Sequence, residues 1–490
     1  MVDFPSMPEN FLTPGVHIEI DNSQANQGLP VQPHKILVIG QMLATGTATA
    51  DTLIKLVTAP EAVVHFGRGS MLAAMVARLK GANNLTEAWA IPMADLGAGA
   101  QAAGDITFTG PATASGTLVL YVAFRRLSIG VSAGDTATEI AAAVQAAIAA
   151  DLDMVVTAAV NGVDDTQVDI TSRHKGEMGN DIDLRVNFHQ GEALPAGVGV
   201  AITAMSGGTG NPDIAAAIAE MADEEFNTIV MPWTDAANLT LLETELADRF
   251  GPMRQIMGHA FAARRGTVSA LGTFGDGRNS PHVSTIGTAT SPSPPWEWAA
   301  GTAGIVALYG GNDPARPFQT LALPGIAPPV ATDRPTREER NLLLQDSIST
   351  FTVDSGGVVR IDRLVTMYNL DSGGLLDRSY LDVNTMYTLS RLRYQLRARI
   401  QQKFPRHKLA DDGNLIGPGQ AVVTPSVIRA ELVALADDWI AAGLVENIGQ
   451  FKTDMIVERS PDDPNRIDAL IAPDLINQLR FFAGLIQFRL

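Results

Sequence analysis

The sequence of 490 residues contains no cysteine. Without thiols the chain can form neither a disulfide framework nor a thiolate nucleophile, and it cannot build a zinc site that needs thiolate ligands. Its eight histidines stand singly along the chain, and no two have the spacing of metal ligands, so we expect each to be an ordinary surface or core residue. The sequence therefore predicts no metal site and no cofactor.

Positive charge is also scarce. The chain has 35 lysine and arginine residues against 53 aspartate and glutamate residues, which gives a formal net charge of −18 at pH 7. A positive field over the whole surface, on which much nucleic-acid binding depends, is excluded by this balance. We expect no direct contact with nucleic acid.

Long apolar runs are missing as well. No stretch approaches the roughly 20 consecutive apolar residues of a membrane-spanning helix. The first ten residues also lack the basic start and apolar run of a secretory signal. We therefore expect a protein that is made in a cytoplasm and does not insert into a membrane. With 46% apolar and 18% charged residues, a chain of this length is expected to fold into about two to four domains.

Signatures of catalysis are hard to find. The zinc-protease motif H-E-x-x-H and the phosphate-binding motif G-x-x-x-x-G-K-[ST] are both absent. The glycine-rich stretch 207–210 could cradle an anion at a helix start, but a hinge after a strand is the simpler interpretation. The acidic pairs at 411–412 and 462–463 lack the regular ligand alternation of a cation-binding loop. We predict no catalytic, cofactor-binding or metal-binding residue.

Residues 1–30 are rich in proline and polar residues and cannot build a core of their own. In their middle, apolar side chains alternate with polar ones, which is the period of a half-buried strand: Val16, Ile18 and Ile20. A single strand needs a sheet elsewhere to pair with. The sequence therefore predicts that 1–30 is an extended N-terminal arm.

From residue 31 onward, short apolar runs alternate with helical stretches, and this rhythm is typical of helices packed on a largely buried sheet. It predicts a layered α/β core in two parts, residues 31–99 and 208–335. The expected strands lie near 36–40, 89–91, 227–231, 255–261 and 282–286, and the expected helices near 70–80, 213–222, 236–249 and 267–274.

Residues 100–207, between the two parts of the core, have a different sequence pattern. They contain a hairpin pattern over 117–131, interrupted at Arg125-Arg126, and several short strands. Thr136 and Glu139 have the spacing of a capping box before an alanine-rich helix over 137–150. Glycine-rich stretches flank the segment on both sides. It is predicted to be an inserted, β-rich domain.

A proline-rich passage over 314–335 is followed by a predicted α+β C-terminal domain, residues 336–478. Thr336 and Glu339 again have the capping-box spacing, and Gly356-Gly357 would turn a hairpin. Further helices are expected over 384–404 and from Pro425 to Gly443, and a strand over 451–459.

The last segment, residues 479–490, reads as a strand with large apolar side chains on both faces. They include Phe482, Leu485, Ile486, Phe488 and Leu490. Such a strand is normally buried on both sides, because exposed it would promote aggregation. We predict an extended C-terminal arm that is covered by another sheet.

A basic run over 391–408 contains no acidic residue, although the chain as a whole is acidic. Helical periodicity places Leu392, Leu396 and Ile400 toward a core. The outward group is then Arg393, Arg397, Arg399 and Lys403. A solvated face and a docking surface for an acidic partner are both open interpretations.

Several motifs resemble those of contractile tail sheath proteins in their Mu-like version. Residues 14–19 (PGVHIE), followed by 21–23 (DNS), are similar to the opening strand of that family. The stretches 279–282 (NSPH), 293–298 (SPPWEW), 403–409 (KFPRHKL) and 487–490 (QFRL) also resemble it. The likeness spans nearly the whole chain, and departures lie mainly in the inserted region.

The resemblance implies a structural subunit and not an enzyme. Sheath subunits of this family form hexameric rings that stack helically around a tail tube, are tied together by exchanged terminal arms, and contract to drive the tube through the host envelope. Partners would be other copies, the tail tube protein, the baseplate and the tail terminator, in a virion tail assembled in the host cytoplasm. Because an insertion is tolerated where few contacts cross its joints, we expect residues 100–207 on the outside and 336–478 inside. The charge of the basic helix, and not the resemblance, suggests that its outward face meets acidic residues of the tube. The sheath of an R-type bacteriocin or other contractile injection system, and a doubly wound α/β enzyme, are the alternatives.

Overall fold

The computed structural model describes residues 29–414, 417 and 419–489. The chain divides into two compact units, which are described separately. The first, here called the body, consists of residues 33–391 with 475–490. The second, here called the C-terminal unit, consists of residues 392–474 with the first described residues, 29–32. The strand predicted at Val16, Ile18 and Ile20 lies outside the described residues.

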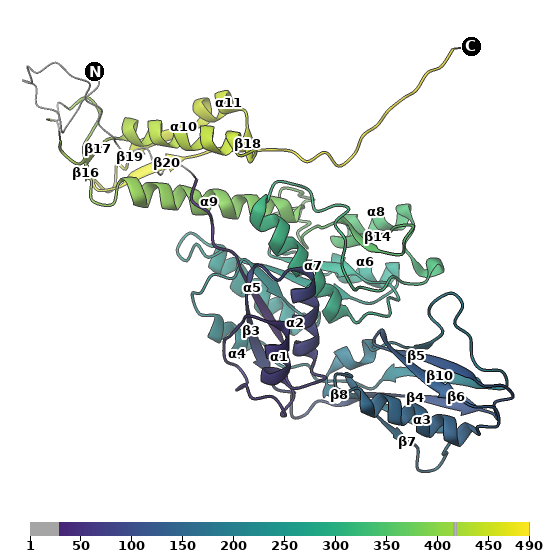
Figure 1. Cartoon of the computed structure of the whole chain (residues 1–490). Coiled ribbons are helices and arrows are strands. Elements are labelled where there is room, and N and C mark those ends of the chain that lie inside the picture. Colours follow the sequence, from purple (N-terminus) through teal and green to yellow (C-terminus); the bar gives the residue numbers. More distant parts are fainter. Residues whose placement is uncertain (1–28, 415–416, 418, 490) are drawn as a thin grey trace, which may run out of the picture. The chain divides into compact units, whose positions relative to one another are not determined.

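An eight-stranded sheet forms the centre of the body (Figure 1). Its inner strands pair in parallel, β2 is antiparallel to β3, and β15 is antiparallel to β14. In sheet order the strands are β15 (Val359–Arg363), β14 (Ile348–Val353), β13 (Val283–Gly287), β12 (His259–Arg264), β11 (Thr228–Val230), β1 (Lys35–Gln41), β3 (Glu87–Met93) and β2 (Ile54–Leu56). The predicted α/β core is thereby confirmed at the level of fold class.

Helices pack on this sheet, and most of them begin at the residues that the sequence indicates. Ser70, Asp235 and Thr267 each accept a hydrogen bond from the third residue beyond, as N-caps do. The helices of the body before residue 346, apart from the inserted segment, are α1 (Ala59–Phe66), α2 (Met71–Ala82), α4 (Ala215–Met221), α5 (Ala236–Phe250), α6 (Val268–Asp276), α7 (Pro295–Asn312) and α8 (Arg337–Gln345).

Helix α7 was not among the predicted elements. It is buried nearly all round and packs against α2 and β12, so its sequence has no polar stripe to reveal a helical period. Gly304 lets the two helices approach closely, since a Cβ there would lie 3.1 Å from the Leu79 carbonyl oxygen. The helix is central to the body.

Residues 101–206 form two further sheets and one helix. The four-stranded sheet has the order β10 (Gly199–Ser206), β4 (Gln101–Thr109), β8 (Gln167–Lys175), β7 (Val156–Val160). The three-stranded sheet has the order β6 (Arg125–Val131), β5 (Gly116–Val122), β9 (Leu184–Val186). The helix α3 (Ala137–Ala150) has the predicted capping box. The hairpin turns at Ala123-Phe124, just before the predicted interruption, and both residues have positive φ, as a tight hairpin turn requires.

The body continues past the boundary predicted at residue 336. The hairpin of β14 and β15 turns at Gly356-Gly357 as expected, yet β14 pairs in parallel with β13 and extends the central sheet. Ile348 and Phe351 are buried in that position. The division between the two compact units therefore falls at 391–392, because this hairpin completes the body's sheet and not a separate one.

The described part of the C-terminal unit contains three helices: the second half of α9 (Val383–Lys403), from Leu392 onward, α10 (Pro425–Ala441) and α11 (Ile448–Asp454). Buried Trp439 donates from Nε1 to the Gln395 side-chain oxygen, 2.9 Å away. A short hairpin, β19 (Ile456–Arg459) with β20 (Ile467–Leu470), lies beside these helices. The strand predicted over 451–459 is wrong in its first half, where α11 buries Phe451. The remaining short pairs are β16 (Lys408–Leu409) with β17 (Val422–Val423), and β18 (Val445–Glu446) with β21 (Asp474–Leu475).

Candidate functional site

The end of the chain exposes a long series of apolar side chains. Residues 476–489 form neither helix nor strand, and in Figure 1 the last residues run away from the body as an extended trace. Six large apolar side chains on this arm are between 71% and 90% exposed: Leu479, Phe481, Phe482, Leu485, Ile486 and Phe488. Leu490 lies outside the described residues. So much contiguous apolar surface marks an interaction site.

The root of this arm is attached to the body by polar contacts that the sequence did not reveal. Gln478 donates from Nε2 to the Ala315 carbonyl oxygen, 3.1 Å away. Arg480 donates from Nη2 to Asp382 Oδ1 at 3.1 Å and to Asn384 Oδ1 at 3.2 Å. Beyond Arg480, no described residue of the body forms a hydrogen bond or an ion pair with the arm. The apolar part of the arm is thus free for another surface.

Among the described residues, the hairpin of β19 and β20 in the C-terminal unit is a sheet of two strands only. Its two strands pair antiparallel from Ile456 opposite Leu470 to Arg459 opposite Ile467. Ile456 and Leu470 are 52% and 58% exposed. A two-stranded sheet in water is marginally stable, and its outer edges present unpaired backbone groups. This hairpin is therefore suited to accept further strands.

The basic helix α9 has the predicted inner face, but part of its positive charge is bound within the chain. Leu392 is buried, and Leu396 and Ile400 are half-buried, as expected for the inner face. Arg393 and Arg397 are also half-buried. Arg391 donates to the carbonyl oxygens of Gly311 and Asn312 and so caps the end of α7. The helix thus uses part of its positive charge within the chain.

Arg399 in particular does not point outward as predicted. Its guanidinium pairs with Glu431 and lies 3.3 Å from Asp438, both on α10, and its side chain is only 12% exposed. The Lys403 ammonium pairs with the same Glu431 at 2.8 Å. Burial would raise the pKa of Glu431, but hydrogen bonds and charge from Lys403 and Arg399 hold it below its ordinary value. Sequence periodicity could not reveal this, because the acidic partners come from another helix.

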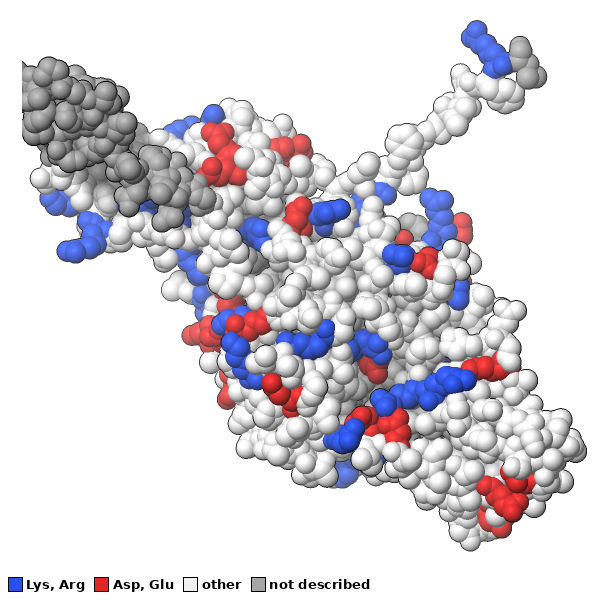
Figure 2. Space-filling view, in the orientation of Figure 1, with Lys and Arg blue, Asp and Glu red and all other residues white. Residues whose placement is uncertain are grey.

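Basic and acidic side chains are interspersed elsewhere on the body. On the face shown in Figure 2, most blue lysine and arginine side chains of the body lie beside red aspartate or glutamate side chains. Ion pairs of the body include Arg68 with Asp153 at 2.8 Å and Arg340 with Asp362 at 3.0 Å. Figure 2 therefore shows no broad basic surface on this face of the body, consistent with the net charge.

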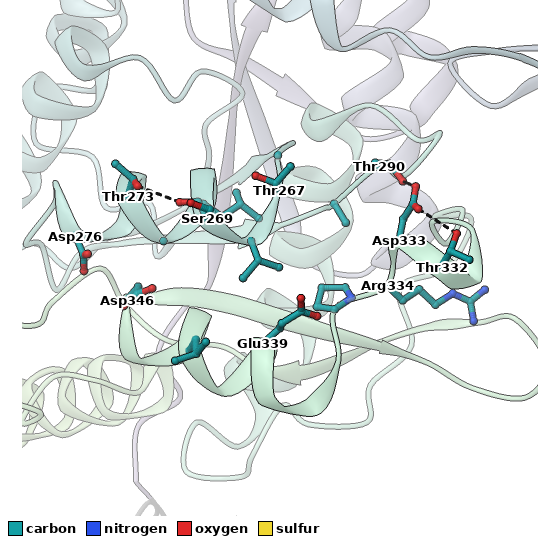
Figure 3. Close-up of a pocket in the computed structure, with 17 residues that line it drawn as sticks. Thr267, Ser269, Thr273, Asp276, Thr290, Thr332, Asp333, Arg334, Glu339 and Asp346 are labelled. Carbon is teal, nitrogen blue, oxygen red and sulfur yellow. Dashed lines mark hydrogen bonds between the residues drawn. The ribbon is translucent and has the colours of Figure 1, made fainter.

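A groove of about 910 Å³ lies between α6 and α8 (Figure 3). Asp333 accepts hydrogen bonds from Thr290 and Thr332, and Glu339 accepts from the backbone of Thr336, so these carboxylates hold local turns. Burial and the charge of Asp276 raise the pKa of Asp346. No histidine lines the groove. It lacks the pairing of nucleophile and base that a hydrolase needs.

One G-x-S-x-G spacing does occur in the chain, at 130–134. Ser132 there lies in the turn between β6 and α3, where its backbone amide donates to Asp135, 2.7 Å away. Within the described part of the chain no histidine hydrogen-bonds to this serine, so it is not a nucleophile elbow. No three histidine, aspartate or glutamate side chains of the described residues gather as a metal site would require. No described helix is long and apolar enough to cross a membrane.

Comparison with known proteins accounts for a chain whose described C-terminal arm is so exposed. Residues 207–367 match the model of the phage tail sheath protein central domain, and residues 376–489 match that of the phage tail sheath C-terminal domain. The chain is 43% identical over 487 residues to the Mu-like prophage FluMu tail sheath protein of Haemophilus influenzae, and the alignment covers 99% of each chain. The chain belongs to the phage tail sheath protein family.

A tail sheath protein is a structural part of a contractile tail, and the family is not one of enzymes. The resemblance to Mu-like sheath proteins is thereby confirmed. Among solved structures, this sheath subunit is similar to a chain in the contracted baseplate of the anti-feeding prophage, with a TM-score of 0.50, 12% identity and coverage of 97% and 98% of the two chains. The sheath tail protein from Desulfitobacterium hafniense gives a TM-score of 0.47 at 14% identity and covers 94% of this chain and 100% of its own. The first of these likenesses indicates a shared fold.

Proposed function

We propose that this sheath subunit polymerises with copies of itself as stacked hexameric rings around a tail tube, and that the assembly contracts to drive the tube through the host envelope. The observation that carries the proposal is the exposed apolar arm at 479–489, in a chain that also contains an incomplete β-hairpin. The arm has strand-like alternation and large side chains on both faces. It is suited to a sheet that its own body does not supply.

In this proposal each arm adds a strand to the hairpin of β19 and β20 in a neighbouring copy. Strand addition would pair the backbone groups of the arm and cover Ile456 and Leu470 at the same time. The N-terminal arm, residues 1–30, would enter the same sheet from another neighbour. Arms exchanged in both directions would keep the copies connected while their bodies move.

Contraction then follows from a difference in buried surface. In the extended sheath the copies would touch chiefly through their arms and the tube, whereas in the contracted sheath the bodies would also pack together. At about 25 cal/mol per Å², a few hundred Å² more per copy corresponds to several kcal/mol before ordering costs. The extended state would therefore be metastable and held by the tube and the baseplate.

The basic face of α9 is proposed to meet acidic residues of the tube. Arg393, Arg397 and Lys403 remain the candidates, while Arg399 is used within the C-terminal unit. Each exposed pair would contribute roughly 0.2 to 1 kcal/mol, so contacts would break readily during contraction and weaken in salt. The inserted region, residues 100–207, would lie on the outside. Further partners would be the baseplate and tail terminator, in a virion tail assembled in the host cytoplasm.

Truncation of the arm tests the proposal. A chain that ends at residue 478 is expected to fold its body but to form no sheath tubes under the electron microscope. Arg489→Ala, which changes the same arm without removing an apolar side chain, is the matched control and should form normal tubes. Normal tubes from the truncated chain would overturn strand exchange by this arm.

A further inference from the structure

The root of the C-terminal arm belongs to a different unit from the residues just before it. The boundary between the two units falls within strand β21 (Asp474–Leu475), because Asp474 belongs to the C-terminal unit and the chain from residue 475 onward belongs to the body. Gln478 and Arg480 hold the segment 476–480 against the body. The unit from which the arm departs is therefore decided by these few contacts.

The Arg480 contacts are unevenly distributed over its guanidinium. Nη2 alone reaches Asp382, Asn384 and the side-chain oxygen of Gln478. Its Nε is buried and has no hydrogen-bond partner among the described residues. A buried donor without a partner loses its hydration and gains nothing in exchange. Arg480 therefore attaches specifically but leaves part of its hydrogen-bonding capacity unused.

The carboxylate that Arg480 uses is already occupied by a second arginine. Arg363 on β15 binds Asp382 in a two-pronged arrangement, with Nε to Oδ1 and Nη2 to Oδ2 both at 3.0 Å. That geometry satisfies the carboxylate by itself. Burial lowers the pKa of Arg480, the charge of Asp382 opposes this, and the charge of Arg363 lowers it further. Release of Arg480 would leave an intact Arg363–Asp382 pair behind.

The other contacts between the segment 476–480 and the body can also break without disturbing the body. Leu479 accepts a long hydrogen bond of 3.5 Å from Gln319, and its side chain is 75% exposed. Asn384, by contrast, is anchored without the arm, because its side-chain nitrogen donates to the carbonyl oxygens of Pro314 and Arg316 at 2.8 Å. The receiving surface on the body is thus complete whether or not the arm is seated.

We propose that the contacts of Arg480 with Asp382 and Asn384, here called the catch, can open and close. They would determine where the C-terminal arm leaves the folded protein and how long its free part is. With the catch closed, the arm departs from the body at residue 481. With the catch open, it departs from the C-terminal unit at residue 476, and five more residues add roughly 17 Å of reach. The inference rests on the proposed exchange of arms between copies. It gives the arm two defined lengths, as a connection between moving bodies requires.

The absence of cysteine makes a direct distance measurement possible. Spin labels at Ser355→Cys, in the exposed turn between β14 and β15, and at Ala483→Cys, on the arm, report how far the arm root lies from the body. We expect one narrow distance distribution in the otherwise unchanged full-length protomer. Arg480→Ala should broaden it at least twofold with a longer component, and Arg480→Lys should lie between. Arg489→Ala, on the same arm, should leave it unchanged.

If Arg480→Ala impairs folding, Gln478→Ala offers a milder opening of the same catch and should broaden the distribution in the same direction. A distribution in Arg480→Ala and Gln478→Ala identical to that of the unchanged arm would overturn the catch. Tube formation separates this from the proposed function. Arg480→Ala should still form tubes because its apolar arm is intact, whereas the chain ending at 478 should not. Release in Arg480→Ala together with normal tubes from the truncated chain would keep the catch and refute strand exchange.

Discussion

The central sheet and the C-terminal arm are both rich in large apolar residues, yet they have opposite environments. Ile36, Val38 and Ile229 in the sheet are completely buried, and their strands pair on both sides. Phe482 and Ile486 in the arm are 85% and 90% exposed, and residues 476–489 form no strand with the described body. The apolar character of a segment therefore does not by itself show whether its side chains are buried within the chain or exposed. The sheet stabilises the fold of the single chain, whereas the arm is proposed to bind a second copy.

The sharpest way to separate these two roles is to remove one aromatic ring from each. Trp298 on α7 is fully buried, packs against Phe351 and donates to Ser291 Oγ at 2.9 Å. Trp298→Ala should lower the free energy of unfolding by about 3 to 5 kcal/mol in chemical denaturation. Phe482→Ala should change it by less than about 0.5 kcal/mol but reduce tube formation. Equal losses of stability in the two variants would contradict the distinction.

A second comparison concerns the two cations that share Glu431. Glu431→Ala leaves the largely buried Arg399 guanidinium with only Asp438, and we expect it to destabilise the C-terminal unit by about 2 to 3 kcal/mol. Lys403→Ala removes the more exposed partner and should cost less than about 1 kcal/mol. Hydrogen exchange of α10 amides measures both. A larger effect from Lys403→Ala would mean that Arg399 is not the structural partner.

An effect of a different kind, which depends on pH and is confined to the body, is expected on acidification. His259 on β12 is buried beside Ser284, and burial, with a contribution from His282, lowers its pKa to about 3. The unfolded chain takes up this proton below its ordinary pKa near 6.5, whereas the folded body does not until about pH 3. Stability is therefore fully present above pH 6.5 and falls by up to about 1.4 kcal/mol per pH unit between those values. In His259→Asn, denaturation between pH 4 and 7 should show a pH slope smaller by about one proton. If the free energy of unfolding of His259→Asn depended on pH as strongly as that of the unchanged protein, His259 would not be the source of the acid sensitivity.

Sequence patterns located the elements that are marked by clear local signals. The capping boxes at Thr136 and Thr336 indicated the starts of two helices, and short apolar runs indicated several strands of the central sheet. Helix α7 escaped because it is apolar on every side, and its place between α2 and the sheet depends on contacts that are distant in the chain. Periodicity alone thus fails where burial is complete.

The surfaces for assembly were only partly predictable, for a similar reason. The two-faced apolar pattern of 479–490 marked the arm, because no surface strand of a single chain would carry it. The contacts of Arg480 and Arg399 depend instead on Asp382, Asn384, Glu431 and Asp438, which lie far from them in the sequence. The sequence also did not reveal that the hairpin after residue 336 joins a sheet begun hundreds of residues earlier.

Cross-linking between copies tests strand exchange most directly. Two single-cysteine proteins, Ile486→Cys on the arm and one of a series over 456–459 or 467–470 on the hairpin, are mixed, assembled and oxidised. Paired strands bring opposite Cβ atoms to about 4.5 to 5.5 Å, close enough for a disulfide after small adjustments. The account predicts a cross-linked pair of different chains at one register, with alternate positions reacting poorly. Tubes that assemble normally yet give no cross-link between chains at any of these positions would contradict it.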